Sequence, residues 1–403
     1  MLENIQNVLN VPEFRKRAVF TLIMFIVFRL GVQIPVPGVD SSVIENLFSS
    51  GNLFGLLDLF AGGALSKFSV LAMSITPYIN ASIIMQLLTA VVPTFEQWAK
   101  DNQEGSDKIQ KVTRYGTVVL ALIQAFAMSY ALKVNNALIV DSWAMVVMVS
   151  LVLTAGTCFL MWLGDQITAG GIGNGISLII FAGIVARFPQ GCMTIYKYIQ
   201  AAAINIFQAL LFAVIALFMI VVVIEVTQGQ RRVTVQYAKR IVGRKMYGGH
   251  STHIPLKVNQ AGVIPIIFAS SVLMFPITIA QFVQNETVQW IGSFFAWGTV
   301  TNTVMYALLI MFFTYFYTAI SLNIPQLTEN MQKYGGFIPG IRPGQPTAMY
   351  IDRIMTRITL AGAFFLAFIA ILPNFIGWIT GIEGVYFGGT AILIVVGVAI
   401  DTM

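Results

Sequence analysis

Hydrophobic residues gather into ten runs along the chain, and charged residues lie mostly between these runs. The runs approach the roughly 20 apolar residues that a helix needs to cross a bilayer. They fall near residues 18–36, 68–90, 115–133, 143–163, 174–188, 204–226, 260–283, 302–322, 355–372 and 385–402. This pattern predicts an all-α polytopic membrane protein with ten transmembrane helices.

A shorter apolar stretch, residues 53–64, precedes the second run. It is too short to cross a bilayer, carries Asp58 and ends at Gly62 and Gly63. Non-helical backbone at membrane depth is tolerated only where protein shields it or where it lines a water-filled cavity. We therefore expect residues 53–67 to form a re-entrant half-helix beside an aqueous space. A short amphipathic helix on the outer surface is the alternative.

Composition supports the membrane class. Of the 403 residues, 57% are hydrophobic and 10% are charged, and the mean hydropathy is +0.80. A soluble domain of this length has a far more polar composition. The segment before the first run lacks the small-residue cleavage site of a signal peptide, so the first run is expected to remain as a span.

Candidate metal chemistry is sparse. Cys158 lies in a span and Cys192 in a loop, without the spacing of a metal or redox site. His250 and His253 form an HxxH pair that has no carboxylate or cysteine partner in the surrounding sequence. No metal and no other cofactor are therefore expected.

Ionisable residues are nearly absent from the spans. Asp165, Glu225 and Asp401 lie at span ends, and Arg29 lies late in the first span, near the interface. Ion-coupled carriers and proton relays normally bury such groups. The sequence GGIGNG at 170–175 lacks the Gly-Lys-Ser/Thr of a phosphate loop, and the motifs HExxH and GxSxG do not occur. The pattern favours neither an enzyme nor a carrier. A secondary transporter and a membrane-embedded hydrolase remain the alternative classes.

Basic residues indicate the orientation, because Lys and Arg near span ends stay cytoplasmic. With a cytoplasmic N-terminus, 18 of the 23 basic residues fall in cytoplasmic segments. Both termini are therefore expected in the cytoplasm. The outer segment 188–203 divides the chain into halves of five spans, 1–200 and 201–403, with inverted topology. Inverted repeats commonly place the working site between the halves, near the bilayer midplane.

Two predicted cytoplasmic loops are longer than a connection requires. In the first, 227–258, Val233, Val235 and Tyr237 alternate with polar residues as in a β-strand, and 251–258 offers a second extended piece. We expect a basic hairpin there. Ordinary positive-inside charge or attraction to anionic lipid is the alternative explanation of its charge.

The second long loop, 323–351, contains Arg342 between two Pro-Gly pairs. Proline restricts the backbone, so this arginine is expected on a stiff exposed turn that suits docking. The alternative is a helix terminator that carries an incidental charge.

Isoleucines recur on the second and fifth spans at a spacing of four, which places them on one helix face. They are Ile75 with Ile79 and Ile176 with Ile180, and Ile267 and Ile394 lie near the middle of the seventh and tenth spans. By periodicity alone, ordinary packing residues explain them.

Five stretches make the chain resemble the SecY family, the channel subunits of the bacterial Sec translocase. They are DLFAGGALSKFSVLAMSITPYINASIIMQLL, GIGNGISLIIFAGIVARFP, NQAGVIPIIFASSVLMFP, GFIPGIRPGQPTAMYI and YFGGTAILIVVGVAI. The resemblance covers nearly all ten spans. The family carries a cytosolic tail, whereas this sequence stops at Met403, where the last span ends.

The resemblance implies a central hourglass pore with three parts. A plug occupies about 53–67 and includes Asp58, Leu59, Phe60, Gly62, Gly63 and Leu65. A pore ring consists of Ile75, Ile79, Ile176, Ile180, Ile267 and Ile394. A lateral gate towards lipid lies between the second and seventh spans and is assigned Asn80, Gln86, Asn259 and Phe275. Counting helical rise from Ile79 and Ile267 places Gln86 and Asn259 at a similar depth, roughly 10 to 12 Å on the cytoplasmic side of the ring.

The resemblance also implies partners and a function. Docking to the ATPase SecA or to the ribosome is assigned to the two loops, through Arg231, Arg232, Lys239, Arg240, Arg244, Lys245 and Arg342. SecE, SecG, signal sequences and unfolded secretory or membrane proteins are the other expected partners. The expected function is a protein-conducting channel of the bacterial plasma membrane, without a catalytic site of its own, that also releases hydrophobic segments into the bilayer.

Overall fold

The computed structural model describes most of the chain. The described residues are 11–40, 62–101, 103–134, 136–201, 204–237, 240–242, 245–247, 251–282, 290, 292, 294–295, 299–380 and 389–402.

Helices dominate the described part of the chain. They are α2 (Pro12–Val32), α5 (Thr76–Val91), α6 (Pro93–Lys100), α7 (Gln103–Val134), α8 (Trp143–Gly170), α9 (Gly175–Gln200), α10 (Ile206–Gln228), α11 (Ile264–Phe282), α13 (Val300–Ser321), α14 (Ile324–Lys333), α15 (Gln345–Thr380) and α16 (Gly389–Thr402). Each of the ten expected runs overlaps one of these helices. Six candidate spans, within α7, α8, α9, α10, α13–α14 and α15, are long and apolar enough to cross a membrane, and α5 with α6 makes a seventh that is bent by 104°.

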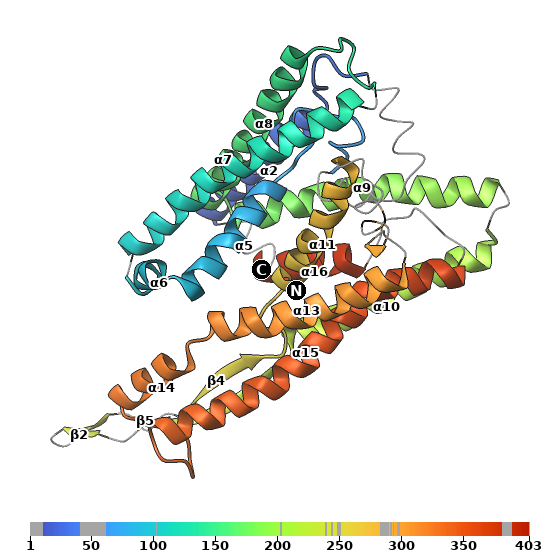
Figure 1. The fold of residues 1–403 in the computed structure, drawn as a ribbon. Helices are drawn as coiled ribbons and strands as arrows, with labels where there is room; N and C mark the ends of the chain where they lie inside the picture. Colours follow the sequence, from blue (N-terminus) through green and yellow to red (C-terminus); the bar gives the residue numbers. More distant parts are fainter. Residues whose placement is uncertain are drawn as a thin grey trace.

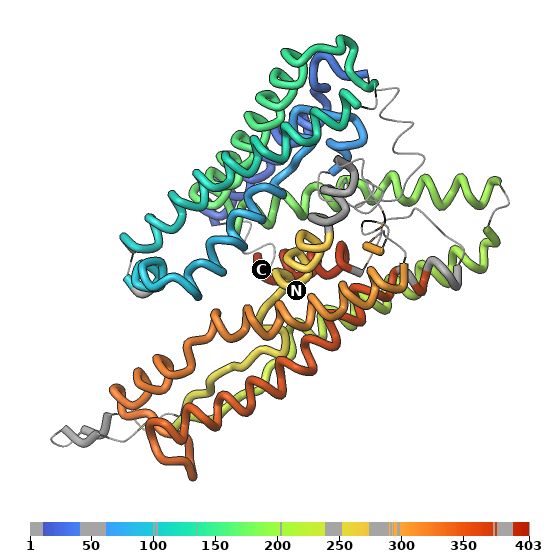
Figure 2. The backbone as a smooth tube through the Cα atoms, viewed as in Figure 1, coloured from blue at the N-terminus to red at the C-terminus, as the bar shows by residue number. Residues whose placement is uncertain are grey.

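The helices form two groups in space (Figure 1). Helices α2, α5, α7 and α8 lie together, and α10, α13 and α15 lie side by side in the second group, with α11 and α16 between the groups. Figure 2 shows the same two groups as backbone paths, with α9 running from the first towards the second.

Two hydrophobic clusters correspond to the two groups. The first is built mainly on α8, on α9 and on the segment 62–75 that precedes α5, and it also includes Ile394 from α16. The second is built mainly on α11, α13 and α15, and it takes Ile83 from α5. Ile79 and Val263 pack against both clusters. The boundary between the groups is therefore apolar on both sides.

The second span differs from the prediction of one continuous helix over 68–90. Its helix begins only at Thr76, and residues 62–75 form consecutive turns. A short antiparallel bridge joins these turns to the end of α2. Val36 N donates to Phe68 O at 3.0 Å, and Val70 N donates to Ile34 O at 2.9 Å. These bonds satisfy part of the polar backbone that a helix would have paired internally.

Protein surrounds this turn segment closely. Ala64, Leu65, Phe68, Leu71 and Ala72 are all at most 3% exposed. Two helices approach it through glycines. A Cβ placed on Gly31 would lie 2.6 Å from Leu71 Cδ1, and one on Gly156 would lie 2.0 Å from Val70 O. A larger side chain at Gly156 would overlap the backbone of the segment, whereas one at Gly31 would displace only the side chain of Leu71.

Two loop predictions were wrong in their boundaries. Residues 188–200, expected as an outer loop, are helical, because α9 continues through Pro189 to Gln200. The predicted span stopped at residue 188, just before Pro189, but the helix includes this proline. The loop 323–351 contains the amphipathic helix α14, whose first turn is capped when Gln326 N donates to Asn323 Oδ1 at 3.1 Å.

The predicted hairpin is confirmed and is larger than expected. Strand β1 (Gln230–Tyr237) pairs antiparallel with β4 (Ser251–Lys257), and Val233 lies opposite Ile254. Strands β2 (Arg240–Val242) and β3 (Lys245–Tyr247) form a second pair. Strand β5 (Gly336–Phe337), from the other long loop, pairs with β1, so the three-stranded order is β4-β1-β5.

The two loops therefore form one unit instead of two. Val233 and Val235 are buried, as their alternation predicted, and they pack in a cluster with Leu256, Met331 and Ile354. Leu256 belongs to β4, Met331 to α14 and Ile354 to α15. The sheet thus rests on the second loop and on the start of α15.

We predict that Gly156→Ala destabilises the fold, because its Cβ would overlap Val70 O. Overpacking of this kind costs about 1–3 kcal/mol. Gly116→Ala on α7 is the matched control, since its Cβ would meet only Ala81 Cβ at an ordinary 3.8 Å and a helical Gly→Ala change gains up to about 1 kcal/mol. Thermal unfolding in detergent should show a lower midpoint for Gly156→Ala only. Equal midpoints in the two variants would contradict the close approach.

Candidate functional site

Five of the six ring isoleucines lie on α5, α9, α11 and α16, and the sixth, Ile75, directly precedes α5. Ile75 is the N-cap residue of α5, and Ile79 stands one turn later. Ile176 and Ile180 lie on α9, Ile267 on α11 and Ile394 on α16. Ile75, Ile180 and Ile394 are buried in the first hydrophobic cluster, and the other three, partly buried, pack against it. The structure therefore brings all six to one apolar region.

Local caps and close contacts position two of them. Asn174 caps α9, because its Oδ1 accepts from Ile176 N at 3.1 Å and from Ser177 N at 3.3 Å. A Cβ on Gly164 would lie 2.9 Å from Ile176 Cγ1, so Ile176 also packs against α8. Ile79 differs from the rest because it packs against both clusters. It stands at the boundary between the two helix groups.

Only part of the predicted plug is described. Asp58, Leu59 and Phe60 lie outside the described residues, while Leu65 is 3% exposed. The half-helix expected over 53–67 does not include 62–67, which form turns. Gly62 and Gly63 have φ of 63° and 90°. This left-handed backbone suits glycine and is incompatible with a continuing right-handed helix.

Two contacts hold the turn segment at Gly62. Arg29 Nη1, from α2, donates to Gly62 O at 2.9 Å. A Cβ placed on Gly62 would lie 2.8 Å from the Cα of Gly183 on α9. The end of the predicted plug is thus fixed between α2 and α9. Sequence reasoning missed both contacts, because nothing in the spacing connects these residues.

The residues assigned to the lateral gate lie on or beside two helices that contact each other, α5 and α11. Asn80 is half-buried, and Gln86 Nε2 donates to Ser82 Oγ within α5 at 3.4 Å. Asn259 is 5% exposed, and its Oδ1 has no hydrogen-bond partner among the described residues. The side chain of Phe275 lies outside the described part.

The depth estimate for Asn259 rested on an incorrect assumption. Residues 258–263 form turns and bends, and α11 begins at Ile264. A rise of about 1.5 Å per residue applies only within a helix. The chain leaves strand β4 and packs Val258 against α15, where a Cβ on Gly362 would lie 2.5 Å from Val258 O. Counting residues from Ile267 therefore does not give the depth of Asn259 in the membrane, and the similar depth predicted for Gln86 and Asn259 has no support from helical rise.

The described basic residues assigned to docking lie on β1, on the separate strand pair β2-β3 and on one turn. Arg231 and Arg232 are exposed on β1, and Arg240 and Lys245 belong to β2 and β3. Lys239 and Arg244 lie outside the described residues.

Arg342 lies on a turn between two Pro-Gly pairs, as the sequence predicted. Gly340 and Gly344 have φ of 84° and 99° on either side of it. The buried Thr347 donates its Oγ1 hydrogen to Arg342 O at 2.8 Å. The backbone carbonyl of Arg342 is therefore hydrogen-bonded while its side chain is exposed.

Among the described residues, no group of three His, Cys, Asp or Glu side chains could hold a metal ion. The charge at one span end is paired, because Arg114 Nη2 on α7 lies 2.9 Å from Asp165 Oδ2 on α8. The region around the six isoleucines is an apolar cluster.

Several apolar helices long enough to cross a membrane, packed around shared apolar clusters, define a multi-pass membrane protein. A family model described as SecY matches residues 69–403. The protein translocase subunit SecY of Halalkalibacterium halodurans is 50% identical over 416 residues, which cover 100% of this chain and 96% of that protein. The Thermotoga maritima subunit is 43% identical over 415 residues, covering 100% and 94%.

Solved structures share the fold. One described as "The structure of a protein conducting channel" superposes with a TM-score of 0.67 at 16% identity, over 96% of this chain and 91% of that one. Canine Sec61 in a ribosome-channel complex gives a TM-score of 0.63 at 15% identity, over 96% and 91%. The chain belongs to the SecY family. It is the non-catalytic, protein-conducting channel subunit of a Sec translocase, as the resemblance predicted.

We predict that Gly62→Ala releases the turn segment from α9, because the new Cβ would overlap Gly183. Gly262→Ala is the matched control, since its φ of 62° imposes the same backbone strain while nothing lies within 4 Å of its Cβ. Hydrogen–deuterium exchange in detergent should increase in peptides covering 64–75 for Gly62→Ala alone. Unchanged exchange in these peptides would show that the Gly62 contact does not hold the segment.

Proposed function

We propose that unfolded secretory proteins cross the bacterial plasma membrane through a constriction formed by the six isoleucines. The observation that carries this proposal is the convergence of these side chains, from α5, α9, α11 and α16, on one apolar region. A narrow apolar constriction dewets and resists ions when empty. It also holds no fixed charge that would retain a passing segment of opposite sign.

We further propose that residues 53–67 form a plug that closes the outer side of this constriction. A solved structure with 16% identity and a TM-score of 0.67 is described as showing that the plug domain of SecY stabilises the closed state and maintains a membrane seal. In this chain, the contacts of Gly62 with Arg29 and Gly183 support a fixed point about which such a plug moves.

Hydrophobic segments leave sideways between α5 and α11 in this proposal, past Asn80, Gln86, Asn259 and Phe275. The buried Oδ1 of Asn259 supports it, because a buried polar atom without a partner costs free energy. Opening the contact between the two helices gives this atom access to water or to the passing chain. The apolar packing of Ile79 and Val263 against both clusters supports the same seam.

The proposed mechanism uses the two halves, 1–200 and 201–403, as inverted units that move apart at this seam. Both termini are placed in the cytoplasm by the positive-inside distribution of Lys and Arg. SecE and SecG are the proposed membrane partners. SecA or a ribosome supplies the driving force at the basic sheet and the Arg342 turn, and the canine Sec61 relative is described in a complex with a ribosome.

Polar replacement of the constriction should weaken its seal. Ile79→Asn and Ile394→Asn are expected to raise the resting ion conductance in planar bilayers, because an amide keeps the pore wetted. Ile79→Leu keeps the surface apolar and is expected to leave the conductance near that of the wild type. Unchanged conductance in both Asn variants, with normal membrane insertion, would remove these residues from the pore.

Arg342→Glu is expected to abolish SecA-driven translocation while the fold is retained, because an exposed charge contributes little to stability. Lys at this position should restore activity only in part, since it lacks the planar fork of donors. Lys333→Glu, an exposed change in the same loop, controls for loop charge in general. The assay is reconstitution with SecE, SecA, ATP and a secretory precursor, scored by protease protection of the precursor. Normal protection with Arg342→Glu would exclude this residue from docking.

A further inference from the structure

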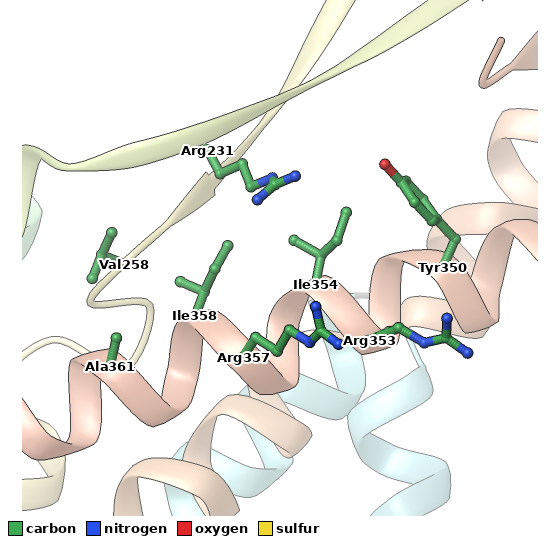
Figure 3. Close-up of a pocket in the computed structure, with 8 residues that line it drawn as sticks. All are labelled: Arg231, Val258, Tyr350, Arg353, Ile354, Arg357, Ile358 and Ala361. Atoms are coloured by element: carbon green, nitrogen blue, oxygen red, sulfur yellow. The ribbon is translucent and has the colours of Figure 1, made fainter.

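A cavity of about 460 Å³ lies between the base of β1 and the first turns of α15 (Figure 3). Three of its lining residues are arginines, Arg231 from the strand and Arg353 and Arg357 from the helix. Figure 3 shows Arg231 extending from the strand side, with Tyr350 and Ile354 projecting from α15 towards the same space. The cavity therefore has a charged rim and a partly apolar wall.

The positive charge around this cavity is uncompensated within the described part of the chain. None of the three arginines has an acidic side chain within 4 Å there, and no acidic residue lines the cavity. Asp352, the nearest carboxylate in sequence, lines a different groove, on the side of α15 that faces α14. Arg353 and Arg357 are one turn apart on one helix, where like charges repel. A bound anion would relieve this repulsion.

Next to this cavity, the sequence of α15 changes from charged to apolar. Residues 358–380 contain no ionisable side chain, whereas Arg353 and Arg357 stand just before them. The cavity thus lies where the charged part of the helix meets the part that crosses the bilayer. Ile354 and Ile358 also line it, so an occupant with a phosphate and an adjoining apolar body would contact both kinds of surface.

We propose that this cavity binds the phosphate of an anionic phospholipid. Arginine presents several donors in a planar fork that matches phosphate oxygens, and its weaker hydration favours binding at an interface. The Tyr350 hydroxyl offers a further donor at the rim. The glycerol and upper acyl carbons would lie against Ile354 and Ile358. A free phosphate would use the arginines alone.

Native mass spectrometry of the purified full chain can test the site. The probes are phosphatidylglycerol and phosphatidylcholine with identical acyl chains, in mixed micelles. The wild type should retain phosphatidylglycerol preferentially, and Arg353→Gln with Arg357→Gln should lower that retention by about tenfold or more, since each basic residue near a lipid surface contributes about 1 kcal/mol. Arg15→Gln with Arg17→Gln removes the same charge from exposed positions at the start of α2 and should leave retention unchanged.

Three results would overturn the proposal. They are equal retention in the wild type and the Arg353/Arg357 variant, an equal loss in the control pair, and complete displacement of the lipid by an excess of inorganic phosphate. The last result would assign the site to free phosphate. If the double variant does not fold, Arg357→Gln is compared with Arg357→Lys. The Lys variant keeps the charge and should retain more lipid than the Gln variant.

Discussion

The burial of a non-helical segment is the constraint on which the rest of the channel depends. Residues 62–75 pack inside the first helix group but do not form a helix. Their backbone N–H and C=O groups therefore need hydrogen-bond partners and shielding from other elements. The end of α2 does so by hydrogen bonds, and Gly31 and Gly156 do so by allowing close approach. Because α5 starts directly after this segment, these contacts decide where Ile75 and Ile79 stand.

The boundary between the helix groups is held by apolar packing. Apolar packing is non-directional, so a seam made of it can close without matching polar partners. Ile79 and Val263 contact both clusters. The two long loops between the spans share one three-stranded sheet and one hydrophobic cluster that packs against it. Helix α15 contributes Ile351, Ile354 and Met355 to that cluster, so both loops pack against its first half.

Sequence patterns predicted the existence of elements better than their ends. Ten apolar runs predicted ten helices, and the alternation at Val233 and Val235 predicted the hairpin. The start of α5 at Thr76 was missed, because residues 68–75 are as apolar as a helix and only their tertiary contacts hold them in turns. Pro189 was taken as a boundary, although α9 includes it. Strand β5 has two residues and no detectable pattern of its own.

The sequence by itself determined the membrane class, the helical content, the orientation preference and the family, because hydrophobic run length, Lys and Arg distribution and local motifs are properties of the chain. Only the tertiary structure decided which residues meet. The bond from Arg29 to Gly62, the packing of Ile176 on Gly164 and the cavity between β1 and α15 each join segments that are far apart or on different elements. These contacts depend on steric fit and burial between separate segments, and the periodicity of residues along one helix carries no information about them.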